Sequence, residues 1–335
     1  MKSKILPMKR QDLFATYNID ASFLSMALAY ESTEPWIYGN FIQIKGFKGN
    51  PQSYFYECQH NRDTPFFLVQ RLGKDLLNTK WKDIIQFIIE CIDLNYYILM
   101  MINKSYLSVY QNTYYKDYLH DIFIYGYDLE QEIIYFAGSA LNGKYSMTSC
   151  SFEEFRTAYV QSDKDGLFDW LYGIVLYQYR NTEMHKVNPD LRLQIKTLLT
   201  HYIESTHMCL FDFSTTAHYD REQLLFGFDV YRNLIDYINK GGFEQLDIRP
   251  FSLFLDHKKI MLQRFKYFNS NQYIEEQNID LGSLVENVQL AEIHWVLALR
   301  YNLTKEEKIK EKIIEHLSRF MEKEYEVYSR IISIL

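Results

Sequence analysis

The sequence predicts an α+β protein in which a mixed N-terminal domain, residues 1–160, is followed by an all-helical domain, residues 161–335. The first half alternates between apolar residues at helical spacing and short apolar runs typical of buried strands. Beyond residue 166, apolar residues recur almost only at the three- and four-residue spacing of amphipathic helices. A chain of 335 residues also exceeds the length that one hydrophobic core usually supports, which favours two domains.

The elements expected first in the N-terminal domain alternate between helix and strand. A helix is expected over residues 21–29, and aromatic and β-branched residues at 36–44 favour a strand or buried turn. Residues 45–51 are expected to form a loop. Isoleucines at helical spacing predict a helix over residues 81–92, and the apolar run at 96–102 predicts a buried strand.

A hairpin and a helix start follow. The apolar runs 120–127 and 132–136 are separated by a four-residue polar turn, in which Asp128 is expected to accept an Asx-type hydrogen bond. Ser151 and Glu154 have the Ser-x-x-Glu spacing of a capping box, in which each side chain bonds the backbone N–H of the other residue. The sequence therefore predicts that a helix begins at this point.

The second domain is expected to contain at least five helices, over residues 191–203, 224–238, 251–268, 284–299 and 305–332. Residues 188–190 should start the first of these helices, Gly241-Gly242 should end the second, and Thr304 with Glu307 should cap the last. The last helix alternates Lys and Glu on a solvated face. Its apolar stripe should dock on the bundle or on a second subunit, which leaves a homo-oligomer open.

Composition and charge argue against several classes of function. The net charge of −7 is opposite to that of a nucleic-acid-binding protein, which normally has a basic face. The four cysteines are far apart and form no CxxC pair, which favours a reducing, cytoplasmic location. No apolar stretch approaches the roughly 18 residues of a membrane span, and residues 1–10 lack the apolar core of a signal peptide.

The order of helix, helix, buried strand, His-led hairpin and Ser-Phe-Glu-Glu-Phe helix resembles papain-like enzymes of the bacteriocin-processing peptidase type. Nearly the whole chain resembles the butirosin biosynthesis protein H family, in which a papain-like N-terminal domain is joined to a helical C-terminal region. The residues that carry this resemblance are 36–39 (WIYG), 120–128 (HDIFIYGYD), 151–155 (SFEEF), 247–249 (DIR) and 256–259 (DHKK).

This resemblance implies acyl transfer in the assembly of bacterial antibiotics or peptide natural products. A Cys takes an acyl or aminoacyl group from the thioester of an acyl or peptidyl carrier protein and passes it to a small-molecule amine acceptor, without a cofactor or metal. Here the position of that Cys falls on Asn18, and His120 falls on the position of the base. The segment expected to supply the third catalytic group, residues 136–139, contains no carboxylate.

Two hypotheses follow from Asn18 at the nucleophile position. Either His120 acts as a base for direct attack of the amine on the thioester, without a covalent intermediate, or the chain is a catalytically inactive binding or scaffold protein. Ser22 or Ser25 could replace the missing thiol, although helical serines more often serve packing or capping. Strand alternation should turn Asp121 to the face opposite His120.

Further candidates have weaker patterns. Cys58 and His60 form a thiol–imidazole pair in a polar run, and Cys91 lies late in an apolar helix. Four metal-ligand residue types occur at irregular spacing, which does not match a zinc site: His201, His207, Cys209 and His218.

The remaining patterns are charged and aromatic. Asp256 and Lys259 lie three apart on a predicted helix, as in a solvated ion pair, and the resemblance makes Arg249 a candidate contact for a carrier phosphate. Five tyrosines before His120 could line an acyl or sugar cleft or form a packed connector: Tyr106, Tyr110, Tyr114, Tyr115 and Tyr118.

Overall fold

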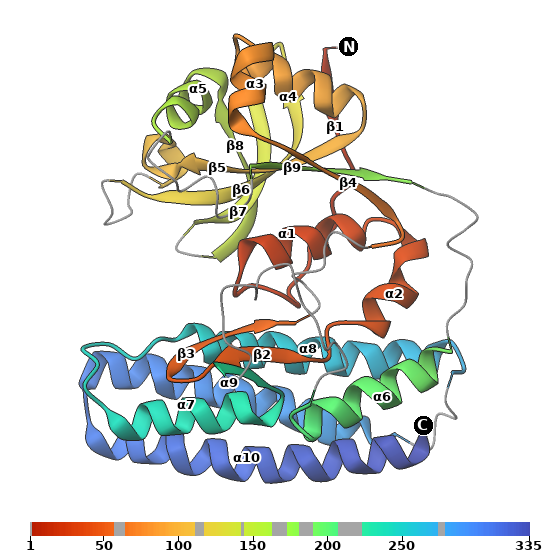
Figure 1. Cartoon of the computed structure of the whole chain (residues 1–335), viewed down its shortest axis with the longest axis vertical. Helices are drawn as coiled ribbons and strands as arrows, with labels where there is room; N and C mark the ends of the chain where they lie inside the picture. Colours follow the sequence, from red (N-terminus) through yellow and green to blue (C-terminus); the bar gives the residue numbers. More distant parts are fainter. Residues whose placement is uncertain are drawn as a thin grey trace. The chain divides into compact units, whose positions relative to one another are not determined.

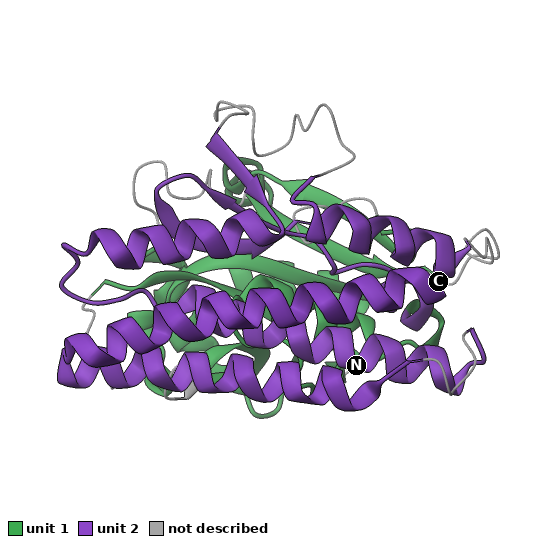
Figure 2. Cartoon of the chain, turned by 90° about the horizontal axis from the view of Figure 1, so that it is seen from below, with its two compact units in different colours: residues 1–33, 61–187 green, residues 34–60, 188–335 purple. Residues whose placement is uncertain are grey.

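The computed structural model describes residues 2–56, 64–110, 117–141, 144–162, 173–180, 190–206, 223–273 and 279–335 (Figure 1). The chain forms two compact units (Figure 2). Unit 1 contains residues 1–33 and 61–187, and unit 2 contains residues 34–60 and 188–335. This division differs from the expected boundary after residue 160, because a late strand joins the sheet of unit 1 and an early hairpin packs in unit 2.

Unit 1 is built on an antiparallel sheet, and the α+β class predicted from the sequence is confirmed. Its strand order is β4-β9-β5-β6-β7-β8, with β1 paired to β6. The strands are β1 (Ser3–Ile5), β4 (Phe67–Leu72), β5 (Tyr96–Asn103), β6 (Leu119–Asp128), β7 (Ile133–Leu141), β8 (Lys144–Ser151) and β9 (Ile174–Tyr179). The central strands β5 and β6 are almost continuously buried, as expected of strands covered on both faces.

Helices cover both faces of this sheet: α3, α4 and α5 lie on one side and α1 on the other (Figure 1). Their bounds are α1 (Asn18–Ala27), α3 (Lys74–Lys80), α4 (Ile84–Asp93) and α5 (Phe152–Val160), with short 3₁₀ turns η1 (Glu31–Thr33), η3 (Lys104–Tyr106) and η4 (Ser108–Tyr110). The helix α1 packs against β6 and β7, so its first residue, Asn18, lies beside the central strands.

The capping box and the Asx-type turn that the sequence predicts in unit 1 are both present. Ser151 Oγ accepts the N–H of Glu154, and Glu154 returns the bond to the Ser151 N–H, which confirms the capping box of α5. Asp128 Oδ1 accepts two backbone N–H groups in the hairpin turn, which confirms its Asx-type role. At Gly126 an added Cβ would lie 2.8 Å from the Lys4 carbonyl oxygen, so glycine allows β1 to pair with β6.

Unit 2 consists of helices with a small antiparallel sheet of order β10-β2-β3. Its elements are α2 (Glu34–Gly39), β2 (Ile44–Phe47), β3 (Asn50–Phe55), α6 (Leu191–Ile203), β10 (Leu224–Phe226), α7 (Phe228–Lys240), α8 (Arg249–Ser270), α9 (Leu281–Thr304) and α10 (Glu307–Ile334). The C-terminal part is therefore not all-helical. Residues 36–44 begin in the helix α2 and end at the first residue of β2, and residues 45–51 run from β2 through a turn at 48–49 into β3 rather than forming a loop.

The last helix differs from its prediction at its start. Thr304 is the last residue of α9, Lys305 adopts a left-handed conformation, and Glu306 is the N-cap of α10, so the expected Thr304–Glu307 capping box is wrong. The apolar stripe of α10 is buried against α6, α7 and α9, which confirms docking on the bundle.

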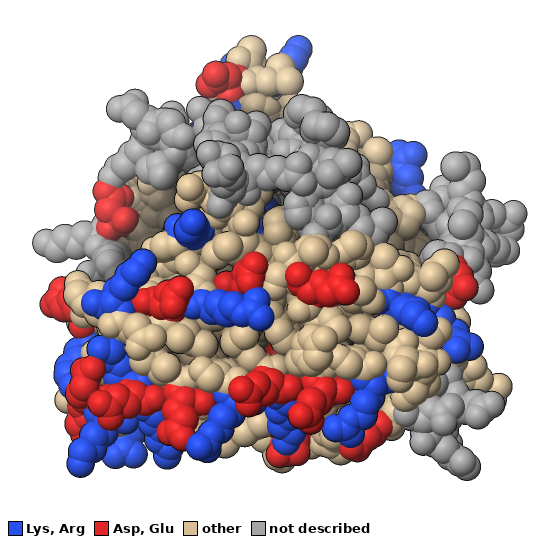
Figure 3. All heavy atoms as spheres, turned by 60° about the horizontal axis from the view of Figure 1, so that its bottom comes forward, with Lys and Arg blue, Asp and Glu red and all other residues tan. Residues whose placement is uncertain are grey.

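Acidic and basic side chains alternate in rows on the face shown in Figure 3. Along α10 they form ion pairs three or four residues apart, for example Arg319–Glu315 and Arg330–Glu326. This is the solvated face that the sequence predicts for the helix. In the described part of the chain, every helix is too short or too polar to cross a membrane.

Candidate functional site

Asn18 and His120 meet in unit 1. Asn18 is the first residue of α1, and His120 is the second residue of β6. The amide nitrogen of Asn18 lies 3.3 Å from Nδ1 of His120 and 3.4 Å from the main-chain oxygen of Asp121. The structure therefore brings together the two residues that the sequence singled out as nucleophile position and base.

Ser139 on β7 fixes the orientation of the Asn18 amide. Its backbone N–H donates to Asn18 Oδ1 at 2.9 Å, and its hydroxyl donates to the same oxygen at 2.5 Å. A backbone N–H can only donate, so the amide oxygen must point to Ser139 and the NH₂ group to His120 and Asp121. The amide of Asn18 is thus hydrogen-bonded at both ends, and an amide offers no nucleophile for a thioester intermediate.

Asp121 does not point away from His120, as strand alternation had suggested. Its Oδ1 lies 2.5 Å from His120 Nδ1. Alternation fixes the direction of each Cα–Cβ bond, but the imidazole ring of His120 reaches back to the neighbouring carboxylate. Residues 136–139, where the third catalytic group was expected, contain no carboxylate, and the carboxylate that contacts His120 comes instead from the next residue, Asp121.

This contact determines which nitrogen of His120 can act as a base. Burial by itself would raise the pKa of Asp121, but the hydrogen bond and charge of His120 and the charge of Lys104 outweigh it and hold that pKa below its ordinary value. An ionised carboxylate at 2.5 Å is a stronger partner than an amide N–H at 3.3 Å. Nδ1 therefore donates to Asp121, which leaves Nε2 as the ring nitrogen that can take up or release a proton.

The His120 side chain is 35% exposed, whereas that of Asp121 is 4% exposed. The carboxylate thus acts from the interior on a ring that solvent reaches. This is the division of roles in a catalytic His–Asp pair, in which a buried acid orients the base.

Aromatic and cationic groups surround the pair. The Tyr118 ring lies 5.3 Å from the His120 ring, and Lys104 Nζ lies 5.0 Å from the Tyr110 ring. A Cβ on Gly138 would lie 3.3 Å from Tyr110 Oη, 3.6 Å from Lys104 Nζ and 3.7 Å from the Asn18 amide nitrogen. Glycine at this position allows these three polar groups to converge.

The tyrosine cluster is only partly at this site. Tyr110 and Tyr118 border it, whereas Tyr106 is exposed. Tyr114 and Tyr115 lie outside the described residues.

The alternative nucleophiles lie elsewhere in the described structure. Ser22 and Ser25 are buried on α1 near the Tyr145 hydroxyl, and neither is among the described contacts of His120. Burial raises the pKa of the Cys91 thiol to about 12 and also raises that of Cys150, which keeps both thiols protonated and unreactive. Cys58 and His60 lie outside the described residues.

Of the four metal-ligand residue types at irregular spacing, only His201 lies among the described residues. His201 on α6 contacts the Thr206 hydroxyl at 2.7 Å, and His207, Cys209 and His218 lie outside the described residues. Within the described part of the chain, no group of three or more His, Cys, Asp or Glu side chains could hold a metal ion.

Three residues of the charged run at 256–259 are buried rather than solvated, and Lys259 is partly exposed. Asp256, His257 and Lys258 of α8 are each at most 2% exposed. Lys258 forms a buried ion pair with Glu324 of α10.

Hydrogen bonds extend this ion pair through unit 2. Lys258 also donates to the Tyr202 hydroxyl at 3.1 Å and to His257 Nδ1 at 2.7 Å, and His257 Nε2 donates to the Ile42 carbonyl. Through Glu324 and Tyr202, Lys258 joins α8 to α10 and α6. Arg249 pairs with Asp247 at 2.7 Å.

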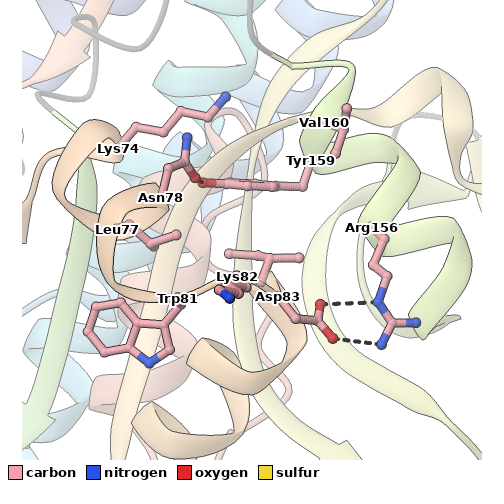
Figure 4. Close-up of a pocket in the computed structure, with 10 residues that line it drawn as sticks. Lys74, Leu77, Asn78, Trp81, Lys82, Asp83, Arg156, Tyr159 and Val160 are labelled. Carbon is pink, nitrogen blue, oxygen red and sulfur yellow. Dashed lines mark hydrogen bonds and ion pairs between the residues drawn. The ribbon is translucent and has the colours of Figure 1, made fainter.

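A separate hollow of about 360 Å³ lies between α3, α4 and α5 of unit 1 (Figure 4). Arg156 and Asp83 form a two-pronged ion pair at its edge, with N–O distances of 3.1 and 2.8 Å. Lys74 lies over the Tyr159 ring on another side. None of Asn18, His120 and Asp121 lines this hollow.

No protein-family model matches the chain, and no curated protein is significantly similar to it in sequence. The fold and the site define an α+β protein in which a buried carboxylate orients a solvent-reaching histidine beside a fixed amide.

Proposed function

We propose that the chain is an acyl or aminoacyl transferase of the butirosin biosynthesis protein H type, with a papain-like arrangement around Asn18 and His120. It moves an acyl group from a carrier-protein thioester to a small-molecule amine. The observation that carries the proposal is the contact between Asp121 Oδ1 and His120 Nδ1, which leaves Nε2 as the base. The convergence of the α1 start and the β6 start at these residues supports the papain-like comparison.

The reaction proceeds by direct transfer. The amine nitrogen attacks the thioester carbonyl carbon while His120 Nε2 accepts the amine proton, and Asp121 stabilises the resulting imidazolium. The C–S bond then breaks, and the carrier thiolate takes the proton from Nε2 to leave as a thiol. General-base catalysis of this kind contributes about 10²–10⁴-fold, and positioning of the two substrates adds to it.

A covalent acyl-enzyme is not part of this mechanism. The position beside His120 holds Asn18, whose amide is already bonded to Ser139 and to the Asp121 main chain. The His120 ring contacts Asn18, Asp121 and Tyr118 in the described structure, and none of these three carries a thiol or a serine hydroxyl.

A second candidate function is a non-catalytic protein that binds a carrier protein. The observation that favours it is the same fixed amide of Asn18, which connects α1, β6 and β7 as a structural brace. A domain with Asn18 in place of a catalytic thiol can keep a surface that binds a carrier protein although it catalyses no reaction.

The experiment that separates the two functions follows product and protein mass together. Wild type, His120→Ala and the control His201→Ala, which alters a histidine of unit 2, are incubated with acyl carrier thioesters and a panel of amines. Transfer predicts amide product and free carrier thiol without a mass adduct, about 100-fold slower in His120→Ala and unchanged in the control. Carrier binding without product in the wild type would contradict the transferase and favour the binding protein.

A further inference from the structure

The helix α9 of unit 2 carries an apolar stripe on its solvent side. Of the large apolar side chains that are exposed in the described part of the chain, four lie on this one helix: Val285, Ile293, Val296 and Leu303. No other described element carries more than one of them. The opposite face of α9 is buried, and the helix packs against α8 and α10 (Figure 1). Exposed apolar residues gathered in this way mark an interaction surface, whereas scattered ones do not.

The stripe has the same pattern when it is read from either end. With about 3.6 residues per turn, six exposed residues fall within one sector of the helix surface. In chain order they are apolar, polar, apolar, apolar, polar and apolar: Val285, Gln289, Ile293, Val296, Arg300 and Leu303. At a rise of 1.5 Å per residue the stripe is about 27 Å long. A surface with such a palindromic pattern is complementary to a second copy of itself that runs in the opposite direction.

Antiparallel pairing of two α9 helices brings apolar residues against apolar ones. The two-fold axis would pass between residues 294 and 295, close to the middle of the stripe. Ile293 of one copy then faces Val296 of the other, near the axis. Val285 of one copy faces Leu303 of the other, at both ends of the stripe. Each apolar residue of the stripe therefore has an apolar partner in this one register.

The charges on α9 favour the same direction and register. Arg300 of one copy would face Gln289 of the other, and Glu286 and Glu292 lie three residues to either side of Gln289. All four of these side chains are exposed. Among the described residues Arg300 has no ion-pair partner, and Glu286 pairs with Lys323 of α10. Antiparallel pairing thus brings Arg300 towards two carboxylates, whereas parallel pairing would set it against the same arginine of the second copy.

We propose that two copies of this chain associate through α9, antiparallel and in this register. The contact is separate from the acyl transfer proposed above and does not depend on it. A helix face about 27 Å long and about 10 Å wide is smaller than the about 800 Å² that each partner of a stable interface buries. The dimer is therefore reversible and dissociates on dilution.

Sedimentation velocity of the full chain, at protein concentrations up to about 1 mM, measures the association. The wild type should change from monomer to dimer as its concentration rises. Val296→Glu places a charge beside the axis and should raise the Kd of the dimer at least about tenfold. The matched control is Leu193→Glu, which changes an exposed apolar residue of α6 and should leave the Kd unchanged. Circular dichroism measures the helix content of each variant. If Val296→Glu loses helix, Arg300→Glu replaces it, because it sets an acid against Glu286 and Glu292.

Disulfide formation tests the register. Val285→Cys and Leu303→Cys are oxidised separately and as a mixture, with the wild type as the background. The mixture should form intermolecular disulfides, and neither variant alone should exceed the background, because identical positions would lie about 27 Å apart. Equal crosslinking of one variant alone would overturn the proposal. So would equal dimerisation of wild type and Val296→Glu. A wild type that stays monomeric at every concentration would also overturn it, and would assign the stripe to a helix of another protein.

Discussion

The amide of Asn18 lies 3.3 Å from the His120 ring, and the backbone N–H of Ser139 holds its oxygen at 2.9 Å. An asparagine thus occupies the place where a papain-like enzyme would carry its thiol. It also ties three elements of unit 1 together.

Asn18→Cys should create a reactive thiol. The new side chain would lie beside His120, and an adjacent imidazole lowers the pKa of a cysteine and raises its reactivity. Peptide mapping after brief treatment with iodoacetamide should show alkylation at position 18 well before Cys91 and Cys150 react. The control Ser25→Cys places a thiol deeper in the same helix and should remain protected. An unreactive Cys at position 18 would contradict the papain-like reading of the site.

Asp121→Asn should destabilise the protein by about 3 kcal/mol near neutral pH, because it breaks a buried charged hydrogen bond and leaves Lys104 without its counter-charge. The pKa of Asp121 in the folded state lies below its ordinary value, which is about 3.9. Its stabilisation is therefore present above that value and is lost as the pH falls through the lower folded-state pKa. Urea unfolding at neutral and acidic pH should show that the free energy of unfolding falls less with decreasing pH in the variant than in the wild type. An equal fall in both proteins would argue against an ionised Asp121.

Glu324→Ala should cost about 3–5 kcal/mol, because it leaves the Lys258 charge buried without its partner. Replacing both members, in Lys258→Met with Glu324→Leu, should cost much less, since no unpaired charge remains. Guanidinium unfolding measures both variants. The exposed pair Arg319–Glu315 is the control, and Glu315→Ala should change stability by less than about 1 kcal/mol. If the double variant were as unstable as Glu324→Ala, the charge pair would not be the cause.

Gly227→Ala should destabilise unit 2 by more than about 2 kcal/mol. Gly227 has a φ of +50°, and an added Cβ would lie 1.9 Å from the Tyr202 carbonyl oxygen, a rigid backbone atom. Gly49→Ala is the matched control: its φ is +78°, but no atom lies within 4 Å of the added Cβ. It should cost only about 1 kcal/mol. Thermal unfolding measures the stability of both variants. An equal loss of stability in the two would show that the backbone relieves the clash between the new Cβ and the Tyr202 carbonyl.

Local periodicity predicted most of the individual elements. The helix at residues 191–203 was predicted with both ends as the structure has them, and the α5 capping box follows from two side chains three residues apart. The β2–β3 hairpin over residues 44–55 was not predicted, and the third strand of its sheet comes from a distant part of the sequence. The strand β2 pairs with β10, from beyond residue 220, and no local pattern reports such a pairing.

The candidate site was predicted in part. Asn18 and His120 were identified from the resemblance of the surrounding motifs to a known family, and their contact is present. Asp121 was expected on the face opposite His120, because strand alternation gives the directions of the Cα–Cβ bonds. It does not give the position of the His120 ring, which contacts the Asp121 carboxylate. Lys104 and Ser139 were missed, although a lysine two residues after the buried run of residues 96–102 is a signal of a buried charge.

The central claim is that Asp121 holds the proton of His120 on Nδ1 and leaves Nε2 as the base. The most direct measurement is the nitrogen-15 NMR spectrum of the His120 ring in the wild-type protein near neutral pH, assigned by comparison with His120→Ala. The account expects a protonated Nδ1 and an unprotonated Nε2. A ring protonated on Nε2 alone would contradict it, because the nitrogen assigned as the base would already carry a proton.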